Sequence, residues 1–388
     1  MPHKKTLIAV LVSLVLAASG CAEDDPKPSG LDGRSEAGTD ASDGGVADIF
    51  VDGQGGCLSW HKLVAPANNN KPSCVAEADE YQPANTANDT WPACISDDNT
   101  YHRVLPDISS IARVAGFEGI VAKLLVGAKN PTAQDFVDAR VIYSEPEGLD
   151  SRVSRREDEH VPAAAKVCAD MTQSEIDANA ERCVGQAQIQ PLLNKAFADG
   201  ANGLEPLDNA ARIEAGLLWF LYVSTYKEAF TCTNVTKDCD SSYAYYTGGE
   251  ARAGGKGLAR YVREVSTQAH DRVFDGILAV RCWRDLDPDV PAKDTARRDQ
   301  ALAQMDKALL RGIALLVKAR VSVLPLICEA HRPAAWITVQ ILGRVLDRAA
   351  RARNTTLADL LKNAIASPTP PSSTVQIQAA LDGLFPCP

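Results

Sequence analysis

The chain has 388 residues, of which 45% are hydrophobic and 23% are charged, and its formal net charge is −10. This length allows a sizeable core in one large domain or two modest ones. The acidic balance and the lack of a basic stripe argue against nucleic acid as a partner, because proteins that bind nucleic acid gather Lys and Arg on one face.

Residues 1–20 are predicted to be a bacterial lipoprotein signal peptide. Lys4 and Lys5 precede an apolar run at residues 7–18, which is too short to span a bilayer. The small residues that follow lead to Cys21 and resemble a lipobox, which implies cleavage before Cys21 and its lipidation. Ala22 stands where an aspartate would favour inner-membrane retention, so we expect an outer-membrane anchor, facing either the periplasm or the outside. The alternative is an ordinary cleaved signal with a stray cysteine.

Residues 21–56 are predicted to be the lipidated cysteine and a disordered acidic tether. After Cys21 the segment consists mainly of Gly, Ser, Asp and Ala, with nine acidic residues against two basic ones. Such a composition buries too little apolar surface to offset the entropy lost on ordering. The tether also carries a large part of the net negative charge, so the remaining domain is only mildly acidic.

The cysteines indicate an exported, oxidised protein. Eleven are present, and without Cys21 the other ten form an even set. An even number of cysteines in an exported chain is typical of a disulfide framework. No CxxC occurs, which argues against a thioredoxin-like couple and against a zinc ribbon. Cys232 and Cys239 are predicted to pair, because a short polar loop separates them, and most of the remaining connectivity is left open.

The ordered region is predicted to begin with an irregular, disulfide-rich segment at residues 57–103, followed by a helical domain at residues 104–388. The first segment is rich in Asn, Pro and Asp, whereas apolar residues recur at helical spacing in the second. No stretch combines two-residue alternation with hairpin turn signals, so the fold class is all-α, as one bundle or two paired bundles. The main predicted helices cover residues 107–127, 131–143, 209–230, 266–287, 294–324 and 333–352.

Two features refine this picture. Residues 217–223 are apolar on every side, which predicts a central helix. The polar stretch at residues 144–168 is interpreted as a link, either between two helical halves or as a long crossover in one bundle. The charged run within it, residues 155–160, could offer carboxylates and an imidazole, and we interpret it as a solvated surface segment.

Residues 237–261 contain three tyrosines within four positions and five glycines. A phosphate-binding loop would need Ser or Thr after Lys256, where Gly257 stands, and a strand before it. Nucleotide binding is therefore not expected. The simplest interpretation is a packed aromatic corner beside a disulfide at Cys239, with the glycines allowing turns and close helix approach.

The functional alternative is a metal site, with iron as the candidate ion. Asp240, Tyr243 and Tyr246 lie in this stretch, while Glu228 and His270 lie on the flanking predicted helices. Carboxylates and phenolates are hard, anionic oxygen ligands of the kind that ferric iron prefers. The opposing interpretation places Glu228 where its helix reaches solvent and His270 in a bond to a backbone group.

The order of four motifs in the last two thirds of the chain resembles the iron-assimilating, low-iron-inducible periplasmic proteins, and more distantly the imelysin-like proteins. The resemblance covers about residues 210–320 and implies a helical, exported protein associated with iron acquisition. Asp240 fits the first acid of the family motif, whereas Ser241 replaces the second acid and Tyr243 a tryptophan. The four motifs are DSSYAYYTGG, GLARYVRE, HDRVFDGILAVRC and ALAQMDKALLRGIALLVKA.

The sequence contains few motifs of enzymes. The mature histidines are too widely spaced for an HExxH zinc protease, and no GxSxG motif occurs. We therefore expect a binding protein with no catalytic residues, anchored in the membrane by lipid, with iron as a candidate ligand. The alternatives are an envelope lipoprotein that contacts protein partners without any small-molecule site, and a hydrolase with scattered catalytic residues.

Overall fold

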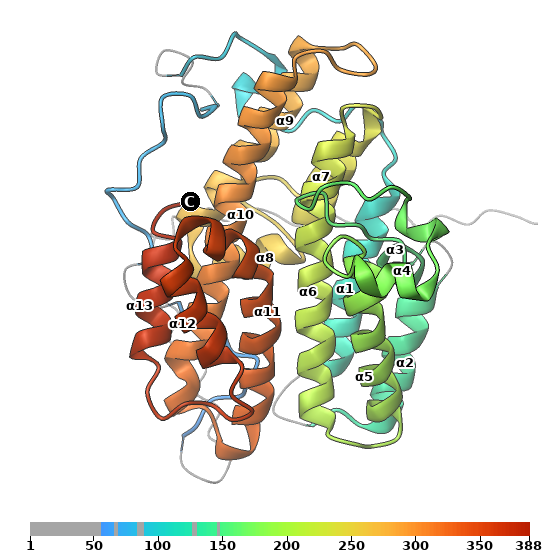
Figure 1. The fold of residues 1–388 in the computed structure, drawn as a ribbon, viewed down its shortest axis with the longest axis vertical. Coiled ribbons are helices and arrows are strands. Elements are labelled where there is room, and N and C mark those ends of the chain that lie inside the picture. The colour runs from blue at the N-terminus through green and yellow to red at the C-terminus, as the bar shows by residue number, and fades with distance from the viewer. Residues whose placement is uncertain (1–55, 66–68, 84–88, 126–129, 146–147) are drawn as a thin grey trace, which may run out of the picture. The chain divides into compact units, whose positions relative to one another are not determined.

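The computed structural model shows an all-α protein (Figure 1). It describes residues 56–65, 69–83, 89–125, 130–145 and 148–388. These belong to one compact unit that spans residues 47–388. Among the described residues, the β pairing is limited to an isolated bridge between Leu58 and Ile327. The predicted fold class, a helical bundle with disulfides, is confirmed.

The predicted signal peptide and tether, residues 1–20 and 21–56, lie outside the described residues apart from Gly56. Within the described ranges, no helix is both long and apolar enough to cross a membrane.

The helices follow one another with short connections after residue 173. The early ones are α1 (Ser109–Leu124), α2 (Ala133–Ser144), α3 (Leu149–Val153), α4 (Gln173–Ala178), α5 (Gln190–Ala201) and α6 (Pro206–Thr231). The later ones are α7 (Lys237–Thr247), α8 (Leu258–Val265), α9 (Thr267–Leu286), α10 (Thr295–Val323), α11 (Arg332–Arg353), α12 (Thr355–Ile365) and α13 (Val375–Leu384). Single turns occur at η1 (Ile95–Asp98), η2 (Cys168–Asp170), η3 (Gly185–Ile189, a π-helix), η4 (Leu324–Leu326) and η5 (Glu329–His331).

Helix α6 is the central element, as its all-round hydrophobicity predicts. Every residue from Leu217 to Val223 is buried. It packs against α5 and α7 on one side and against α11 on the other (Figure 1). The long pair α9 and α10 packs closely because Gly276 lies directly on the backbone of Met305, where a Cβ atom would come within 2.4 Å of the Met305 Cα.

Five disulfides join the ten cysteines from Cys57 onward. Cys232 is bonded to Cys239, the pair expected from their short separation, and Cys168 to Cys183. The other three connect the irregular N-terminal segment to the late helices and to the C-terminal end, across 188 to 313 residues of sequence. They are Cys57–Cys328, Cys74–Cys387 and Cys94–Cys282.

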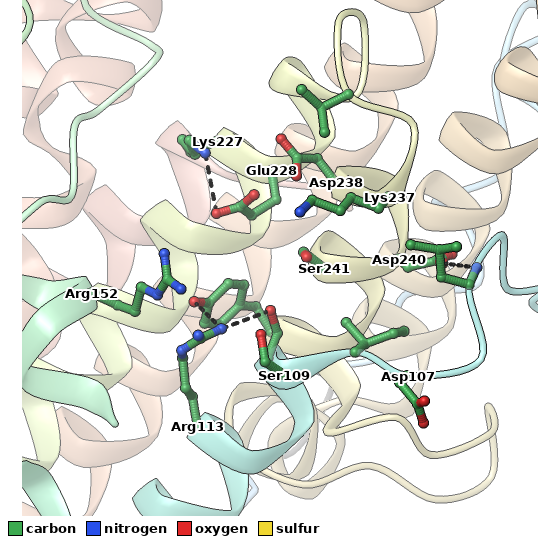
Figure 2. A pocket seen from close by; sticks show the side chains of 15 residues that line it. Asp107, Ser109, Arg113, Arg152, Lys227, Glu228, Lys237, Asp238, Asp240 and Ser241 are labelled. Atoms are coloured by element: carbon green, nitrogen blue, oxygen red, sulfur yellow. Dashed lines mark hydrogen bonds and ion pairs between the residues drawn. The ribbon is translucent and has the colours of Figure 1, made fainter. Parts of the chain in front are cut away.

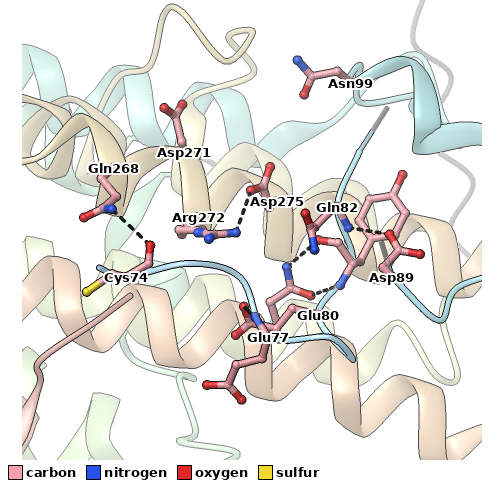
Figure 3. Close-up of polar contacts among 12 residues, drawn as sticks. Cys74, Glu77, Glu80, Gln82, Asp89, Asn99, Gln268, Asp271, Arg272 and Asp275 are labelled. Atoms are coloured by element: carbon pink, nitrogen blue, oxygen red, sulfur yellow. Dashed lines mark hydrogen bonds and ion pairs between the residues drawn. The ribbon is translucent and has the colours of Figure 1, made fainter. Parts of the chain in front are cut away.

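Side chains of α9 and α10 hold the N-terminal segment between these disulfides (Figure 3). Gln268 of α9 accepts a hydrogen bond from the Lys71 amide and donates to the Cys74 carbonyl. Gln304 of α10 accepts from the Tyr81 amide and donates to the Tyr81 carbonyl, at 2.8 and 2.9 Å. Because both backbone groups are satisfied by one amide side chain, the segment needs no regular secondary structure at this point.

The charged run at residues 155–160 corrects one prediction, because most of it is not a solvated segment. Arg156 is 5% exposed and donates to Glu228 at 2.9 Å. Arg182 is bonded to both glutamates of the run. His160 lies between two aspartates, one in the run and one on α10. The residues that pair with this run are 23 to 146 positions away in the chain, so the run forms several long-range ion pairs.

Candidate functional site

A cavity of about 530 Å³ lies where the start of α1, the end of α6 and the first turn of α7 meet (Figure 2). Of the predicted metal ligands, Glu228 and Asp240 line it. Figure 2 shows Arg113 and Arg152 at one side of the cavity and Asp240 at the other.

Asp240 is fully buried and is used to anchor the backbone. Its carboxylate accepts hydrogen bonds from the Tyr101 hydroxyl at 3.0 Å and from the Val104 and Leu105 amides at 2.9 and 2.8 Å. These donors belong to the segment that leads into α1. The carboxylate therefore fixes the rim of the cavity, and its oxygens already have three donors.

Glu228 is also buried and is neutralised within the protein. It forms ion pairs with Arg156 at 2.9 Å and with Lys227 at 3.3 Å. Burial by itself would raise the pKa of the Glu228 carboxyl, but Arg156 and then Lys227 outweigh it and hold that pKa below its usual value. The interpretation that places Glu228 where its helix reaches solvent is wrong, because the side chain is buried and is paired with an arginine from a distant segment.

Asp238 is a third acid at the cavity and it behaves differently. The Thr231 hydroxyl donates to its carboxylate at 2.7 Å. Burial and then the charge of Glu228 raise the pKa of the Asp238 carboxyl. Because this pKa is raised and that of Glu228 is lowered, Asp238 accepts a proton more readily than Glu228 does.

The basic side chains around the cavity were missed by the sequence analysis. Arg113 is buried and donates to the Ser110 and Tyr245 hydroxyls at 3.3 and 3.5 Å. Lys237 is exposed, and its charge acts on the neighbouring Asp238, but its ammonium forms no ion pair or hydrogen bond within the described ranges. With Arg152 and Lys227, four cationic residues line the cavity. The available signal was the position of Arg113 in the second turn of the helix predicted to start at Asp107.

The start of α1 adds backbone donors to the cavity. The predicted helix begins at Asp107, whereas the N-cap in the structure is Ile108, which provides no capping side chain. The amides of Ser109 and Ser110 in the first turn therefore have no acceptor from the cap, and both residues line the cavity. Uncapped first-turn amides and the helix dipole favour negative charge at this position.

The remaining predicted ligands lie elsewhere. The Tyr246 hydroxyl donates to His270 Nδ1 at 3.1 Å, and His270 Nε2 donates to the Arg252 carbonyl at 2.8 Å. Burial lowers the pKa of His270, which agrees with this neutral tautomer. Tyr243 donates to the Glu250 carbonyl at 2.8 Å and stacks on Tyr101. The interpretation of His270 as a histidine bonded to a backbone group is the arrangement found.

The structure thus divides the five predicted ligands among three environments. Glu228 and Asp240 share the cavity, Tyr246 and His270 form a buried pair, and Tyr243 packs between the rings of Tyr101 and Phe274. In the described ranges, no group of three or more His, Cys, Asp or Glu side chains is placed to hold a metal ion.

A hydrolase would need a bonded serine and histidine in a pocket. Ser59 and His61 lie 3.1 Å apart at the start of the described chain, and neither lines this cavity.

The chain matches no protein-family model, no curated protein and no solved structure. The likeness to iron-assimilating proteins therefore depends on the motif residues alone.

Proposed function

We propose that this chain is an outer-membrane lipoprotein whose helical domain binds a small anionic ligand in the cavity between α1, α6 and α7. The lipobox-like residues before Cys21 support the anchor, and the five disulfides agree with an oxidising compartment. In this proposal the domain works in the cell envelope as a binding protein.

Four acids and four bases line the cavity, so the observation that carries the proposal is which of these groups already have partners. Asp240 is saturated by three donors and Glu228 is paired with Arg156 and Lys227. The Lys237 ammonium and the first-turn amides of α1 are left with capacity for an acceptor. A carboxylate or phosphate placed between them gains charge-assisted hydrogen bonds in a partly desolvated space.

Iron enters this proposal as a complex with an anionic chelator. The oxygens of Asp240 and Glu228 are committed to protein donors, so a ferric ion ligated by them would displace bonds that the fold uses. A ferric carboxylate complex brings its own hard ligands and presents an anionic surface. An anionic ferric complex as the ligand is compatible both with the resemblance to iron-assimilating proteins and with the basic side chains of the cavity.

The test uses the mature chain with Cys21→Ser, which keeps it unlipidated, and measures thermal unfolding. Citrate and ferric citrate should each raise the Tm relative to sodium chloride of equal ionic strength. A ligand at a hundredfold excess over its Kd stabilises the folded state by about 2.7 kcal/mol, which corresponds to several degrees. No shift with citrate, phosphate or ferric citrate contradicts the proposal.

One substitution separates binding from folding. Ser109→Asp places a negative charge in the first turn of α1, where acidic residues stabilise a helix by about 0.3–1 kcal/mol. Ser109 is exposed, so the variant is expected to fold normally while it repels an anion from the cavity. Lys195→Gln is the matched surface control, since its side chain is 76% exposed and lies outside the cavity.

Direct iron ligation is distinguished in the same experiment. If tyrosine oxygens bind the ion, a visible tyrosinate charge-transfer band appears with ferric citrate and is lost in Tyr246→Phe. In that case the Ser109→Asp variant retains its iron response, and the anionic-complex form of the proposal is wrong.

The second candidate is an interaction lipoprotein whose cavity rim contacts an envelope protein. Leu105 and Val235 line the cavity and are 43% and 41% exposed, so they provide apolar contact area beside the charged groups. Absence of any ligand shift, together with a partner captured through Leu105 and lost in Leu105→Glu, favours this candidate.

A further inference from the structure

A second hollow region lies between η3, α6, α11 and α12. It consists of two cavities of about 370 and 400 Å³, and both are lined by Gln188, Arg344 and Asp347. Because they share these residues, the two cavities adjoin along α11. We propose that together they form a binding site for an acidic amphiphile, with the acidic head in the first cavity and the apolar tail in the second. This site is separate from the one described above.

The head group would be held by two arginines of α11. Arg344 and Arg348 are one helical turn apart, and both line the first cavity. Both are exposed, and neither forms an ion pair or hydrogen bond with the described part of the chain. Like charges at this spacing repel each other, and an anion between them removes that repulsion while gaining bidentate contacts.

The acids beside these arginines are largely engaged by other bases. Asp158 accepts from His160 at 2.6 Å, and Asp347 is paired with Arg351 at 3.0 Å. Glu181 is the remaining acid at this cavity and it is exposed. Among the described residues, one unpaired carboxylate thus stands against two unpaired guanidinium groups, so the first cavity favours an anion.

The second cavity has a mixed lining, of which the part between α11 and α12 is apolar. Gly343 and Ala350 of α11 face Ala358, Leu361 and Ile365 of α12. These small and aliphatic residues offer no charge, while the polar side chains of the cavity come from Gln340, Lys362 and the three shared residues. In the first cavity, Trp219 and Tyr222 of α6 add aromatic surface close to the arginines. Aliphatic contact area beside basic side chains is the chemistry that binds an alkyl carboxylate.

Isothermal titration of the Cys21→Ser mature chain with decanoate, below its micelle concentration, tests the proposal. Decanoate should bind, octanoate should bind roughly tenfold or more weakly because it lacks two CH₂ groups, and decyltrimethylammonium should not bind. Equal binding of the cationic and anionic amphiphiles, or no binding of decanoate, overturns the proposal.

Variants locate the site. Arg344→Gln with Arg348→Gln should weaken decanoate binding at least tenfold, and Ala366→Trp should weaken it by filling the rim of the apolar cavity, where Ala366 is exposed. Arg155→Gln, an exposed arginine that lines neither cavity, is the charge control. Unchanged binding in the double arginine variant contradicts the proposal, and circular dichroism checks that each variant is folded.

Two sources could supply this chemistry, and a vesicle experiment distinguishes them. Free decanoate binding without flotation on phosphatidylglycerol vesicles indicates a soluble fatty acid. Flotation that requires Arg344 and Arg348 and is blocked by decanoate indicates a membrane lipid, whose anionic phosphate takes the place of the carboxylate. Retention of decanoate binding in Ser109→Asp shows that the site is independent of the cavity at α1.

Discussion

Arg320 and Glu214 form an ion pair in the middle of the helical domain, 3.2 Å apart, with side chains that are 2% and 1% exposed. Glu214 belongs to α6 and Arg320 to α10, so the pair links the two central helices. Its remaining capacity is used as well, because the Tyr261 hydroxyl donates to Glu214 and Arg320 donates to the Trp60 carbonyl. The pair therefore joins four parts of the chain at one buried point.

Breaking this pair from one side is expected to be costly. Glu214→Leu leaves the Arg320 charge buried and unpaired, which should lower the free energy of unfolding by about 3–5 kcal/mol. The double variant Glu214→Leu with Arg320→Met removes both charges and should lose less than Glu214→Leu alone. Denaturant unfolding of the variants measures this, and an equal or larger loss in the double variant would contradict it.

His160 is expected to make stability depend on pH. Burial would lower the pKa of His160, but Asp306 and then Asp158 outweigh it and raise that pKa above 6.5. A raised pKa in the folded state contributes stability that is fully present below the unfolded pKa and is lost as pH rises through the folded pKa. The loss of unfolding free energy caused by His160→Gln should therefore become smaller as the pH rises above 6.5.

At low pH, the stabilisation by the His160–Asp158 ion pair is limited by protonation of Asp158. Burial would raise the pKa of Asp158, but the hydrogen bond from His160 holds it below its usual value. Its contribution is present above the unfolded pKa and is lost as pH falls through the folded one. The matched control is His102→Gln, whose side chain is 36% exposed and paired with Asp98. A constant difference between the protein and His160→Gln from pH 5 to pH 9 would show that the bridge is not titrating.

Two glycine substitutions should have opposite effects. In Gly276→Ala the new Cβ would meet the Met305 backbone at 2.4 Å, so α9 and α10 must move apart, at a cost of about 1–3 kcal/mol or more. In Gly116→Ala the nearest atom, Leu149 Cδ1, is 3.6 Å away, an ordinary contact. Alanine in a helix interior is then favoured over glycine by about 1 kcal/mol. Denaturant unfolding of the two variants measures both signs, and a loss of stability in Gly116→Ala would contradict the ordinary contact between Gly116 and Leu149.

Lipidation is expected to depend on Cys21 alone. Cys21→Ser should abolish incorporation of labelled palmitate and move the protein from the membrane fraction to the soluble fraction, because acyl chains contribute about 0.8 kcal/mol per buried CH₂ to anchoring. Cys21→Ser that remains in the membrane fraction would show that another feature holds the protein there.

The sequence predicts those features that depend on local pattern. Residues 217–223 are apolar on every side, which is enough to place α6 at the centre, and the Cys232–Cys239 bond follows from a short loop. Helix α5 was not predicted, because it follows a π-helical turn that interrupts the helical period. The other helices that were not predicted have only 5 to 11 residues each, and they are α3, α4, α7, α8, α12 and α13. The signals that failed were those of interrupted or brief elements.

Features that depend on distant partners could not be predicted. Asp240 was interpreted as a metal ligand, yet its principal partners are backbone amides 135 and 136 residues away, which leave no trace in residue type. The run at residues 155–160 was interpreted as solvated because its composition is charged, while its burial depends on Arg182, Glu228 and Asp306. Composition reveals that such groups need partners but does not reveal whether water or protein provides them.

The bond between Cys57 and Cys328 has a mechanical consequence. Cys57 lies at the beginning of the described chain, and Cys328 lies in the turn between α10 and α11. Tension applied to the chain ahead of Cys57 is therefore transmitted covalently to that turn, and the irregular stretch that follows Cys57 carries little of it. When the domain is pulled from this end, we expect it to stay folded until α10 and α11 separate from each other.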